Sequence, residues 1–146
     1  MSDVRFASIG ALLLRLSLGI LFIPHGLAKL KNPAGFAGFL QQLHVPAPTL
    51  FAWIVALLEV VGGALLIVGL LTRVVGLGLA VEMLVAILAV KIGRAHAPFT
   101  SSGQTSGWEF EFILLAVGLA LAFLGTGMYG VDHALRRRSS TAPAPL

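Results

Sequence analysis

One apolar stretch near the start of the chain carries three side chains that are charged or titratable: Arg15, His25 and Lys29. At about 100° of rotation per residue, His25 lies about 80° and Lys29 about 40° from Arg15 around a helix, so the three share one face. Charged groups in a membrane helix usually face the bundle interior and pair with groups on neighbouring helices. The spacing therefore predicts that this face contacts acidic residues elsewhere in the chain.

Acidic partners are available in the later apolar stretches, at Glu59, Glu82 and Glu109. Counted from the expected cytoplasmic ends of the helices, Arg15 lies about 12 Å deep and Glu82 about 14 Å deep, so these two are predicted to form a structural ion pair. Glu59, at about 20 Å, belongs to a second polar layer toward the outer face. The predicted ligand-binding pocket comprises Arg15, His25, Lys29, Glu59, Glu82 and Glu109.

Two nearby charges are expected to lie outside this pocket. Glu109 and Glu111 are about 200° apart on a helix, so at most one of them points into the pocket, and Glu109 is predicted to do so. Lys91 faces away from Glu82 on its helix and is predicted to extend toward the membrane interface.

A quinone headgroup suits an apolar site in which arginine, histidine and carboxylates converge. The cationic side chains would hydrogen-bond a carbonyl oxygen, and the carboxylates would exchange protons as the ring is reduced or oxidised. The alternative is a structural network that fixes the register of the helices. No haem is expected, because His25 is the one histidine within a span. No metal is predicted either, although Glu59, Glu109 and His25 could form a ligand set.

The composition indicates that these residues lie in a membrane protein. Hydrophobic residues make up 58% of the 146-residue chain and charged residues 11%, with a mean hydropathy of +0.97. A soluble domain has about 25% charged residues. The absence of cysteine excludes disulfides, thiolate metal sites and iron–sulfur clusters in this chain, so redox chemistry would need a borrowed cofactor.

The net charge of +4 comes largely from Arg136, Arg137 and Arg138. A basic cluster beside a membrane helix is typical of contact with anionic lipid in the bilayer. No nucleic-acid partner is predicted.

Hydropathy predicts four spans and therefore an all-α, polytopic membrane protein, built as an antiparallel four-helix transmembrane bundle. The spans cover about residues 7–28, 50–71, 74–90 and 108–125. They form a single transmembrane domain over residues 7–132, and the basic segment 133–146 is predicted to be a disordered cytoplasmic tail. A cleavable signal peptide is the competing interpretation of the first span, but no A-x-A site follows it.

A short amphipathic helix is expected in the membrane interface between the first and second spans. Asn32 is a suitable N-cap, with Pro33 at the first helical position. One apolar face follows from the helical spacing of Phe36, Phe39, Leu40 and Leu43.

Small residues predict close packing between the spans. They include Gly62, Gly63 and Gly69 in the second span, and Gly76 and Gly118 in the third and fourth. The same glycines could instead mark a homodimer face. A count of Lys and Arg in the loops gives five on the side of the termini against four on the other side, which favours cytoplasmic termini.

Six segments carry a resemblance to a known family. They are LLLRLSLGILFIPHGLAKL, NPAGFAGFLQQLHVPAP, LLEVVGGALLIVGLLTR, EMLVAILAV, GWEF and LGTGMYGVD, which together extend from residue 12 to residue 132. In order and spacing they resemble the DoxX family of small bacterial membrane proteins. The resemblance implies a four-helix protein of the bacterial cytoplasmic (inner) membrane. The chain departs from the pattern at Lys91, where many relatives have histidine, and in the loop that contains His96, so a ligand role for that histidine is not carried over.

Three functions follow from these observations. The first is a redox-associated subunit that binds a quinone or small electron carrier and receives electrons from a soluble or membrane redox partner. The resemblance supports it, because relatives include a subunit of a thiosulfate:quinone oxidoreductase and a membrane partner in an oxidative-stress complex. The second is a non-enzymatic anchor or scaffold for a soluble oxidoreductase, and the third is a small-solute transporter, although no inverted repeat or broken helix pair is evident. Whether the chain is itself an enzyme is left open.

Overall fold

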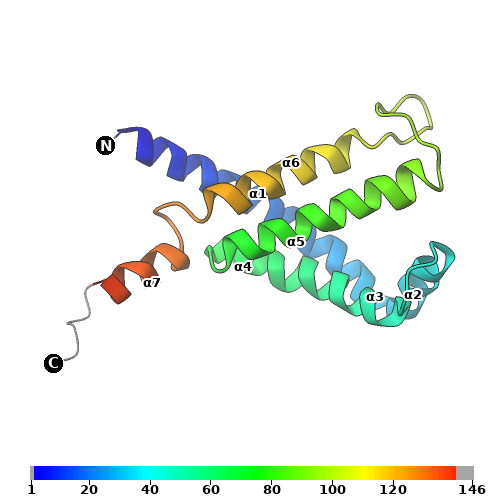
Figure 1. Ribbon diagram of the computed structural model, residues 1–146, viewed down its shortest axis with the longest axis horizontal. Helices are drawn as coiled ribbons and strands as arrows, with labels where there is room; N and C mark the ends of the chain where they lie inside the picture. The colour runs from blue at the N-terminus through cyan, green and yellow to red at the C-terminus, as the bar shows by residue number, and fades with distance from the viewer. Residues whose placement is uncertain (1, 141–146) are drawn as a thin grey trace.

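Helices form nearly all of the regular structure. The computed structural model describes residues 2–140, and its helices are α1 (Ser2–Lys31), α2 (Pro33–Gln42), α3 (Pro48–Leu57), η1 (Leu58–Gly62), α4 (Gly63–Val68), α5 (Thr72–Val85), η2 (Ala86–Ile92), α6 (Glu109–Leu124) and α7 (Val131–Ser140), where η denotes a π-helical turn (Figure 1). One isolated β-bridge joins Ser102 and Thr105 in the loop before α6. The predicted all-α class is confirmed.

Three helical stretches of the described chain are long and apolar enough to cross a membrane. They run over Asp3–Lys31, Pro48–Val68 and Thr72–Ile92. α6 has 16 residues, or about 24 Å of helix, which is shorter than a hydrocarbon core of about 30 Å. Figure 1 shows α6 beside α5 and running in the opposite direction. The fourth span, and with it the complete four-helix transmembrane bundle, stays a prediction.

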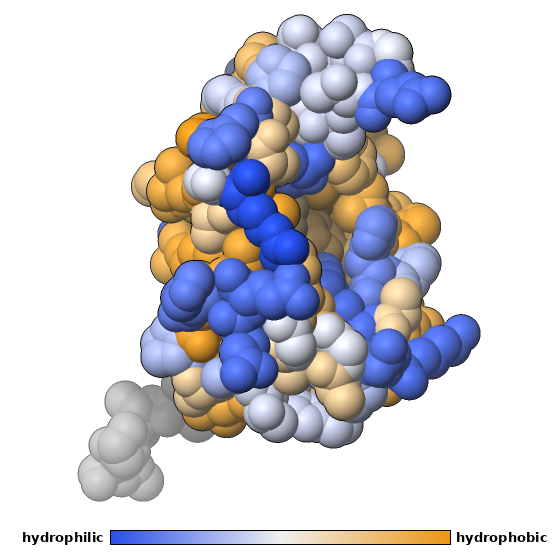
Figure 2. Space-filling model, turned by 90° about the vertical axis from the view of Figure 1, so that its right-hand side faces the viewer, coloured by the Kyte–Doolittle hydropathy of each residue, from blue (hydrophilic) through white to orange (hydrophobic). Residues whose placement is uncertain are grey.

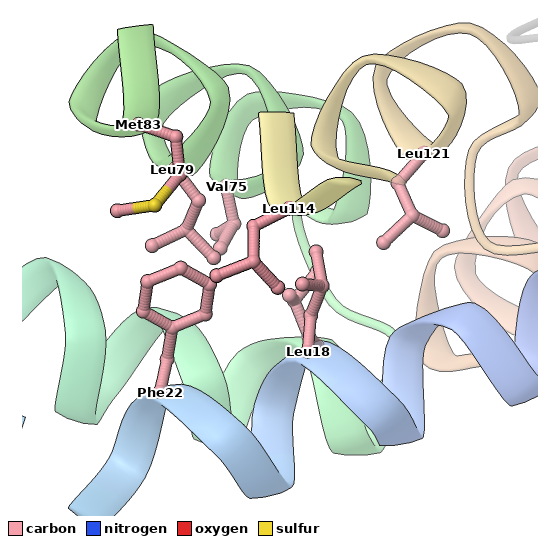
Figure 3. Close-up of a cluster of buried hydrophobic side chains, with 8 residues drawn as sticks. Leu18, Phe22, Val75, Leu79, Met83, Leu114 and Leu121 are labelled. Atoms are coloured by element: carbon pink, nitrogen blue, oxygen red, sulfur yellow. The ribbon is translucent and has the colours of Figure 1, made fainter. Parts of the chain in front are cut away.

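Apolar side chains from α1, α4, α5 and α6 converge between the helices, as Figure 3 shows. A Cβ atom on Gly118 would lie 2.8 Å from the carbonyl oxygen of Gly76, and one on Gly19 would lie 2.6 Å from that of Gly63, so both pairs of backbones meet closely. The predicted close packing is confirmed at Gly63, Gly76 and Gly118, whereas Gly19 was not predicted to take part. Because it occurs within one chain, it removes the argument for a homodimer face at these positions. The buried cluster comprises Leu18, Phe22, Leu66, Val75, Leu79, Met83, Leu114 and Leu121.

The outer surface is apolar along the helices and polar at the end of the molecule where α2 lies. Large apolar side chains such as Leu57, Val61, Val81 and Ile113 are exposed on the sides of the helices. Figure 2 views the end that carries α2 and the loop before α6, where hydrophilic residues gather and hydrophobic residues flank them. Apolar exposure of this extent marks a surface that contacts a membrane.

α2 begins at the predicted cap. The Asn32 Oδ1 atom accepts a hydrogen bond from the Gly35 N–H group at 3.0 Å, and Pro33 is the first residue of the helix. Leu40 of α2 is buried in a small cluster with Ala52 of α3. A helix therefore stands where the sequence predicts one, and its position in the membrane interface stays a prediction.

The first part of the predicted disordered tail is helical. α7 covers residues 133–140 of that segment, and its Asp132 carboxylate accepts hydrogen bonds from the N–H groups of Leu71 at 2.9 Å and Thr72 at 3.1 Å. This contact fixes the start of α7 against the start of α5, and the Ala, Leu and Arg residues that follow favour helix. The rest of the predicted tail, residues 141–146, lies outside the described residues.

Candidate functional site

Three charged side chains from three elements meet in the interior: Lys29 of α1, Glu59 of η1 and Glu82 of α5. The Lys29 ammonium group donates a hydrogen bond to Glu59 Oε2, with which it forms an ion pair, and lies 3.9 Å from Glu82 Oε1. Glu59 and Glu82 each stand near the middle of a candidate membrane span. We refer to these residues as the Lys29–Glu59–Glu82 cluster.

Local structure directs the three side chains toward one another. Lys29 lies near the C-terminal end of α1, and helical side chains lean toward the N-terminus, so its stem extends back toward the middle of the helices. Glu59 lies in the π-helical turn η1, which widens the helix and changes the direction of its side chains. α1 approaches this turn at Gly26, where an added Cβ would lie 2.8 Å from the Glu59 Cβ. The Lys29 ammonium also lies 5.2 Å from the centre of the Phe36 ring of α2.

The cluster has more acidic than basic groups. With both carboxylates ionised, two negative charges face one ammonium group. The exposed fraction of the side chain is 2% for Glu59, 12% for Glu82 and 23% for Lys29. The Glu82 Oε2 atom is buried and has no hydrogen-bond partner among the described residues. Since an unbalanced charge inside a membrane is costly, this oxygen is a place where a proton or a donor group of a ligand would be stabilised.

Arg15 does not form the predicted ion pair with Glu82. Its side chain is fully buried and donates hydrogen bonds only to backbone carbonyl oxygens among the described residues. Two of these carbonyls lie at the C-terminal end of α4, where helix carbonyls carry partial negative charge, and two lie in the loop after α6. The donors and acceptors are Nε to Leu66 at 2.8 Å, Nη2 to Ile67 at 2.9 Å, and Nη1 to Thr126 at 2.9 Å and Tyr129 at 3.0 Å.

The predicted depth of Arg15 is wrong because α1 extends past the ends of α4 and α6 (Figure 1). Two turns before Arg15, Ser8 already contacts the loop after α6, where its Oγ accepts a hydrogen bond from the Met128 N–H group at 3.1 Å. Arg15 is therefore level with the turn between α4 and α5. Glu82 lies about 15 Å further along α5, beyond the reach of an arginine side chain, and it faces Lys29 instead.

The residues that hold Arg15 in place were not predicted from the sequence. The Thr126 hydroxyl donates to the Gly69 carbonyl at 3.0 Å, and the Asp132 N–H group donates to the same carbonyl at 2.9 Å. The negative charge of the Asp132 carboxylate also stabilises the positive charge of Arg15. Gly69 has φ +76°, and an added Cβ would lie 2.6 Å from the Arg15 Cζ, so a side chain does not fit there. The available signal was the arginine itself, since a buried guanidinium needs several acceptors and helix ends supply them.

Comparison with known proteins identifies the family. The family profile described as DoxX matches residues 10–92, which is more than half of the chain. The chain belongs to the DoxX family. The resemblance seen in the sequence is thereby confirmed. The DoxX match contains Arg15 and the Lys29–Glu59–Glu82 cluster, whereas Glu109 and Asp132 lie beyond it.

Three DoxX-type relatives are similar to this chain over most of their length. The chain is 36% identical over 124 residues to "Putative oxidoreductase CatD" of Bacillus subtilis, a match that covers 85% of both proteins. It is 32% identical over 138 residues to "Uncharacterized membrane protein Rv3486" of Mycobacterium tuberculosis, covering 90% of this chain and 84% of that protein. It is 31% identical over 136 residues to "Inner membrane protein YqjF" of Escherichia coli, covering 92% and 98%. No solved structure shows significant similarity.

Besides Arg15, two predicted pocket residues of this DoxX protein are not brought to the cluster. His25 is exposed on α1, although it lies only one turn before Lys29. Glu109 stands at the start of α6, where its Oε1 atom accepts a hydrogen bond from the Ser101 N–H group of the preceding loop at 2.8 Å. Of the six predicted pocket residues, the structure therefore unites Lys29, Glu59 and Glu82.

A second charged pair lies at the loop end of α5 and α6. Lys91 lies 3.2 Å from Glu111 Oε1, and its ammonium group donates to Ser106 Oγ and to the Gly107 carbonyl, both at 2.9 Å. In the part of the chain that the structure describes, no group of three His, Asp or Glu side chains is placed to hold a metal ion. The ligand set of Glu59, Glu109 and His25 is accordingly not assembled.

Proposed function

We propose that this DoxX-family protein is a membrane subunit of a redox system, and that its Lys29–Glu59–Glu82 cluster binds the headgroup of a quinone or another small electron carrier. The observation that supports this most strongly is the buried Glu82 oxygen without a partner, close to an ammonium group in the middle of a candidate span. The Bacillus subtilis relative bears the name of an oxidoreductase, which favours redox chemistry over transport.

Access to the cluster supports a ligand that arrives through the bilayer. Glu59 is sealed from the surface, but Glu82 and Lys29 keep 12% and 23% of their side chains exposed. An apolar carrier dissolved among the lipid chains would therefore meet the ammonium and carboxylate groups at the side of the helices. Apolar walls with a few convergent polar groups are typical of small-molecule sites.

Each residue of the cluster has its own task in this proposal. Lys29 donates a hydrogen bond to a carbonyl oxygen of the headgroup, and Glu59 keeps the ammonium group oriented. Glu82 passes a proton to that oxygen on reduction and takes it back on oxidation, and it is reprotonated from water. When bound, a quinone would take up two electrons from a partner oxidoreductase and two protons, one through Glu82 and the other from water.

The quinone content of gently purified protein tests this proposal. Mass spectrometry of organic extracts is expected to find near-stoichiometric quinone in the wild type. The Glu82→Gln and Lys29→Met variants should lose it by about tenfold or more, because each removes a hydrogen bond to a charged group. Glu111→Gln is the matched control, since it removes a half-buried carboxylate outside the cluster. Wild-type quinone content in both cluster variants would contradict the proposal.

The second candidate is a non-enzymatic anchor for a soluble oxidoreductase. The observation that favours it is α7, whose exposed Arg136, Arg137 and Arg138 stand at the end of the described chain. Under this alternative the cluster only holds the helices together. Phospholipid alone in every extract, together with recovery of an oxidoreductase that depends on α7, would favour this function.

We also propose that the protein lies in the inner membrane with both termini in the cytoplasm, with α6 as the fourth span and α2 in the interface. The name of the Escherichia coli relative supports the location. The basic residues Arg73 and Arg136 to Arg138 support the orientation, since cytoplasmic ends of membrane helices carry an excess of Lys and Arg.

A further inference from the structure

We propose that a cavity at the end of the molecule where α1 begins binds the headgroup of an anionic phospholipid. The cavity has a volume of about 380 Å³ and lies between the first turns of α1, the loop after α6, and α7. It is separate from the Lys29–Glu59–Glu82 cluster, and the inference does not depend on the redox proposal.

One wall of the cavity is cationic. Arg73 at the start of α5 and Arg136 of α7 line it together with His133, and no acidic side chain is among the lining residues. An arginine side chain presents a planar fork of N–H donors that matches the oxygens of a phosphate group. The lining hydroxyls are already engaged within the protein, since Ser8 donates to the Val4 carbonyl at 2.8 Å and Thr126 donates to the Gly69 carbonyl. The positive charge of this wall therefore comes from its arginines and not from its hydroxyl residues.

The other wall is apolar and reaches the outer surface. Its Val4, Leu124 and Met128 side chains are 62%, 52% and 42% exposed. The cavity also lies beside the beginning of the candidate span Thr72–Ile92 and the first turns of the span Asp3–Lys31, and lipid headgroups lie where membrane spans end. A soluble phosphate would use only the cationic wall. A phospholipid uses both, with its phosphate on the arginines and its glycerol and acyl chains on the apolar side chains.

A bound lipid would join elements that contribute to the Arg15 site. The loop of residues 125–130 borders the cavity and supplies the Thr126 and Tyr129 carbonyls that Arg15 binds. A ligand that bridges α1, α5 and α7 across this loop stabilises the folded state by mass action. Phosphatidylglycerol should therefore raise the melting temperature of the purified protein more than phosphatidylcholine does.

Native mass spectrometry in a neutral detergent tests the proposal directly. The probes are phosphatidylglycerol, phosphatidylcholine with the same acyl chains, and inorganic phosphate. The wild type should retain one phosphatidylglycerol and no phosphatidylcholine. One basic residue near a membrane surface contributes about fivefold in affinity, so Arg73→Gln should weaken retention about fivefold and Arg73→Gln/Arg136→Gln about 25-fold. Arg5→Gln is the matched control, because it removes the same charge at the same end but lies outside the cavity lining.

Two results would overturn the proposal. Equal weakening of phosphatidylglycerol retention by Arg5→Gln and Arg73→Gln would mean that retention depends only on the total charge of this end of the molecule. Displacement of phosphatidylglycerol by millimolar inorganic phosphate would assign the site to a soluble phosphate and not to a lipid. The melting temperature of each variant shows whether it is folded. Should Arg73→Gln fail to fold, Arg136→Gln on the exposed α7 carries the same comparison with Arg5→Gln.

Discussion

Two cations inside the helices, Arg15 and Lys29, differ in what surrounds them. Arg15 donates to four carbonyl oxygens and lies close to one acidic group, Asp132, so its donors are well matched. Lys29 faces two carboxylates, and one oxygen of Glu82 is left without a partner. A charged group whose donors all have acceptors stabilises the fold, whereas a group with an unsatisfied polar atom can exchange a proton or accept a ligand. This difference favours a structural role for Arg15 and, under the proposed function, a ligand-binding role for the Lys29–Glu59–Glu82 cluster.

The excess negative charge of the cluster predicts effects of very different size on the free energy of unfolding for two substitutions. Glu82→Gln removes the excess and should change the free energy of unfolding by no more than about 0.5 kcal/mol in the destabilising direction. Lys29→Met leaves two buried carboxylates without a cation and should lower the free energy by about 3 kcal/mol or more. Denaturation in detergent, followed by the fluorescence of Trp53 and Trp108, measures both. Lys31→Met, which removes an exposed lysine of the same helix, is the control. Equal losses in the two cluster variants would show that the cluster is balanced.

At the scale of the helices, the sequence predicted the elements better than their relative offset. The apolar runs located the three candidate spans, and Asn32 with Pro33 located the start of α2. Hydropathy does not report how far one helix extends past another, so the depth of Arg15 was misplaced. Its true level depends on the carbonyls at the end of α4, which only the folded chain brings together.

The same lack of information about helix positions explains which residues of the candidate site could be predicted from the sequence. The sequence could predict that Lys29, Glu59 and Glu82 converge, because charged side chains in a membrane span usually pair with one another. The exposure of His25 and the contact of Glu109 with the loop could not be predicted, since both depend on the exact rotation of a helix. The π-helical turn that carries Glu59 adds a local change of rotation that no periodicity in the sequence reveals.

Close contact between α5 and α6 predicts a strong effect of size at one position. Gly118→Leu should lower the free energy of unfolding by about 1–3 kcal/mol, because the new side chain would meet the Gly76 carbonyl and Ala80. Thermal unfolding in detergent checks this. Gly10→Leu is the control, since no atom lies within 4 Å of a Cβ added there. Similar stability of the two variants would contradict the observed approach of the helices.

For the whole molecule, the absence of cysteine makes the membrane topology directly measurable. Ser102 lies in the loop before α6 and Ala134 lies in α7 after it, and both are exposed. If α6 is a span, Ser102→Cys and Ala134→Cys should react with an impermeant maleimide from opposite sides of the membrane, with Ala134→Cys protected in intact cells. Both should react once the membrane is permeabilised. Labelling of both in intact cells would contradict the fourth span and the cytoplasmic C-terminus.

Arg15 and Asp132 are far apart in the sequence, yet they hold one joint between α1, α4, α5 and α7. Asp132 accepts from the first N–H groups of α5 and donates to the Gly69 carbonyl, while Arg15 binds the last carbonyls of α4. Loss of either side chain should weaken the contact between these helices, so that the remaining side chain contributes less to the free energy of unfolding.

Arg15→Met and Asp132→Ala should therefore be non-additive, with a coupling energy of about 1 kcal/mol or more in a double-mutant cycle of unfolding. Arg15→Met combined with Glu111→Gln, whose carboxylate lies at the opposite end of the helices, should be additive within about 0.5 kcal/mol. Additivity in both cycles would mean that the two ends of the chain are joined by packing alone. Coupling confined to the Arg15 and Asp132 pair would show that this joint sets the position of α1, and through it the height at which Lys29 meets the two carboxylates.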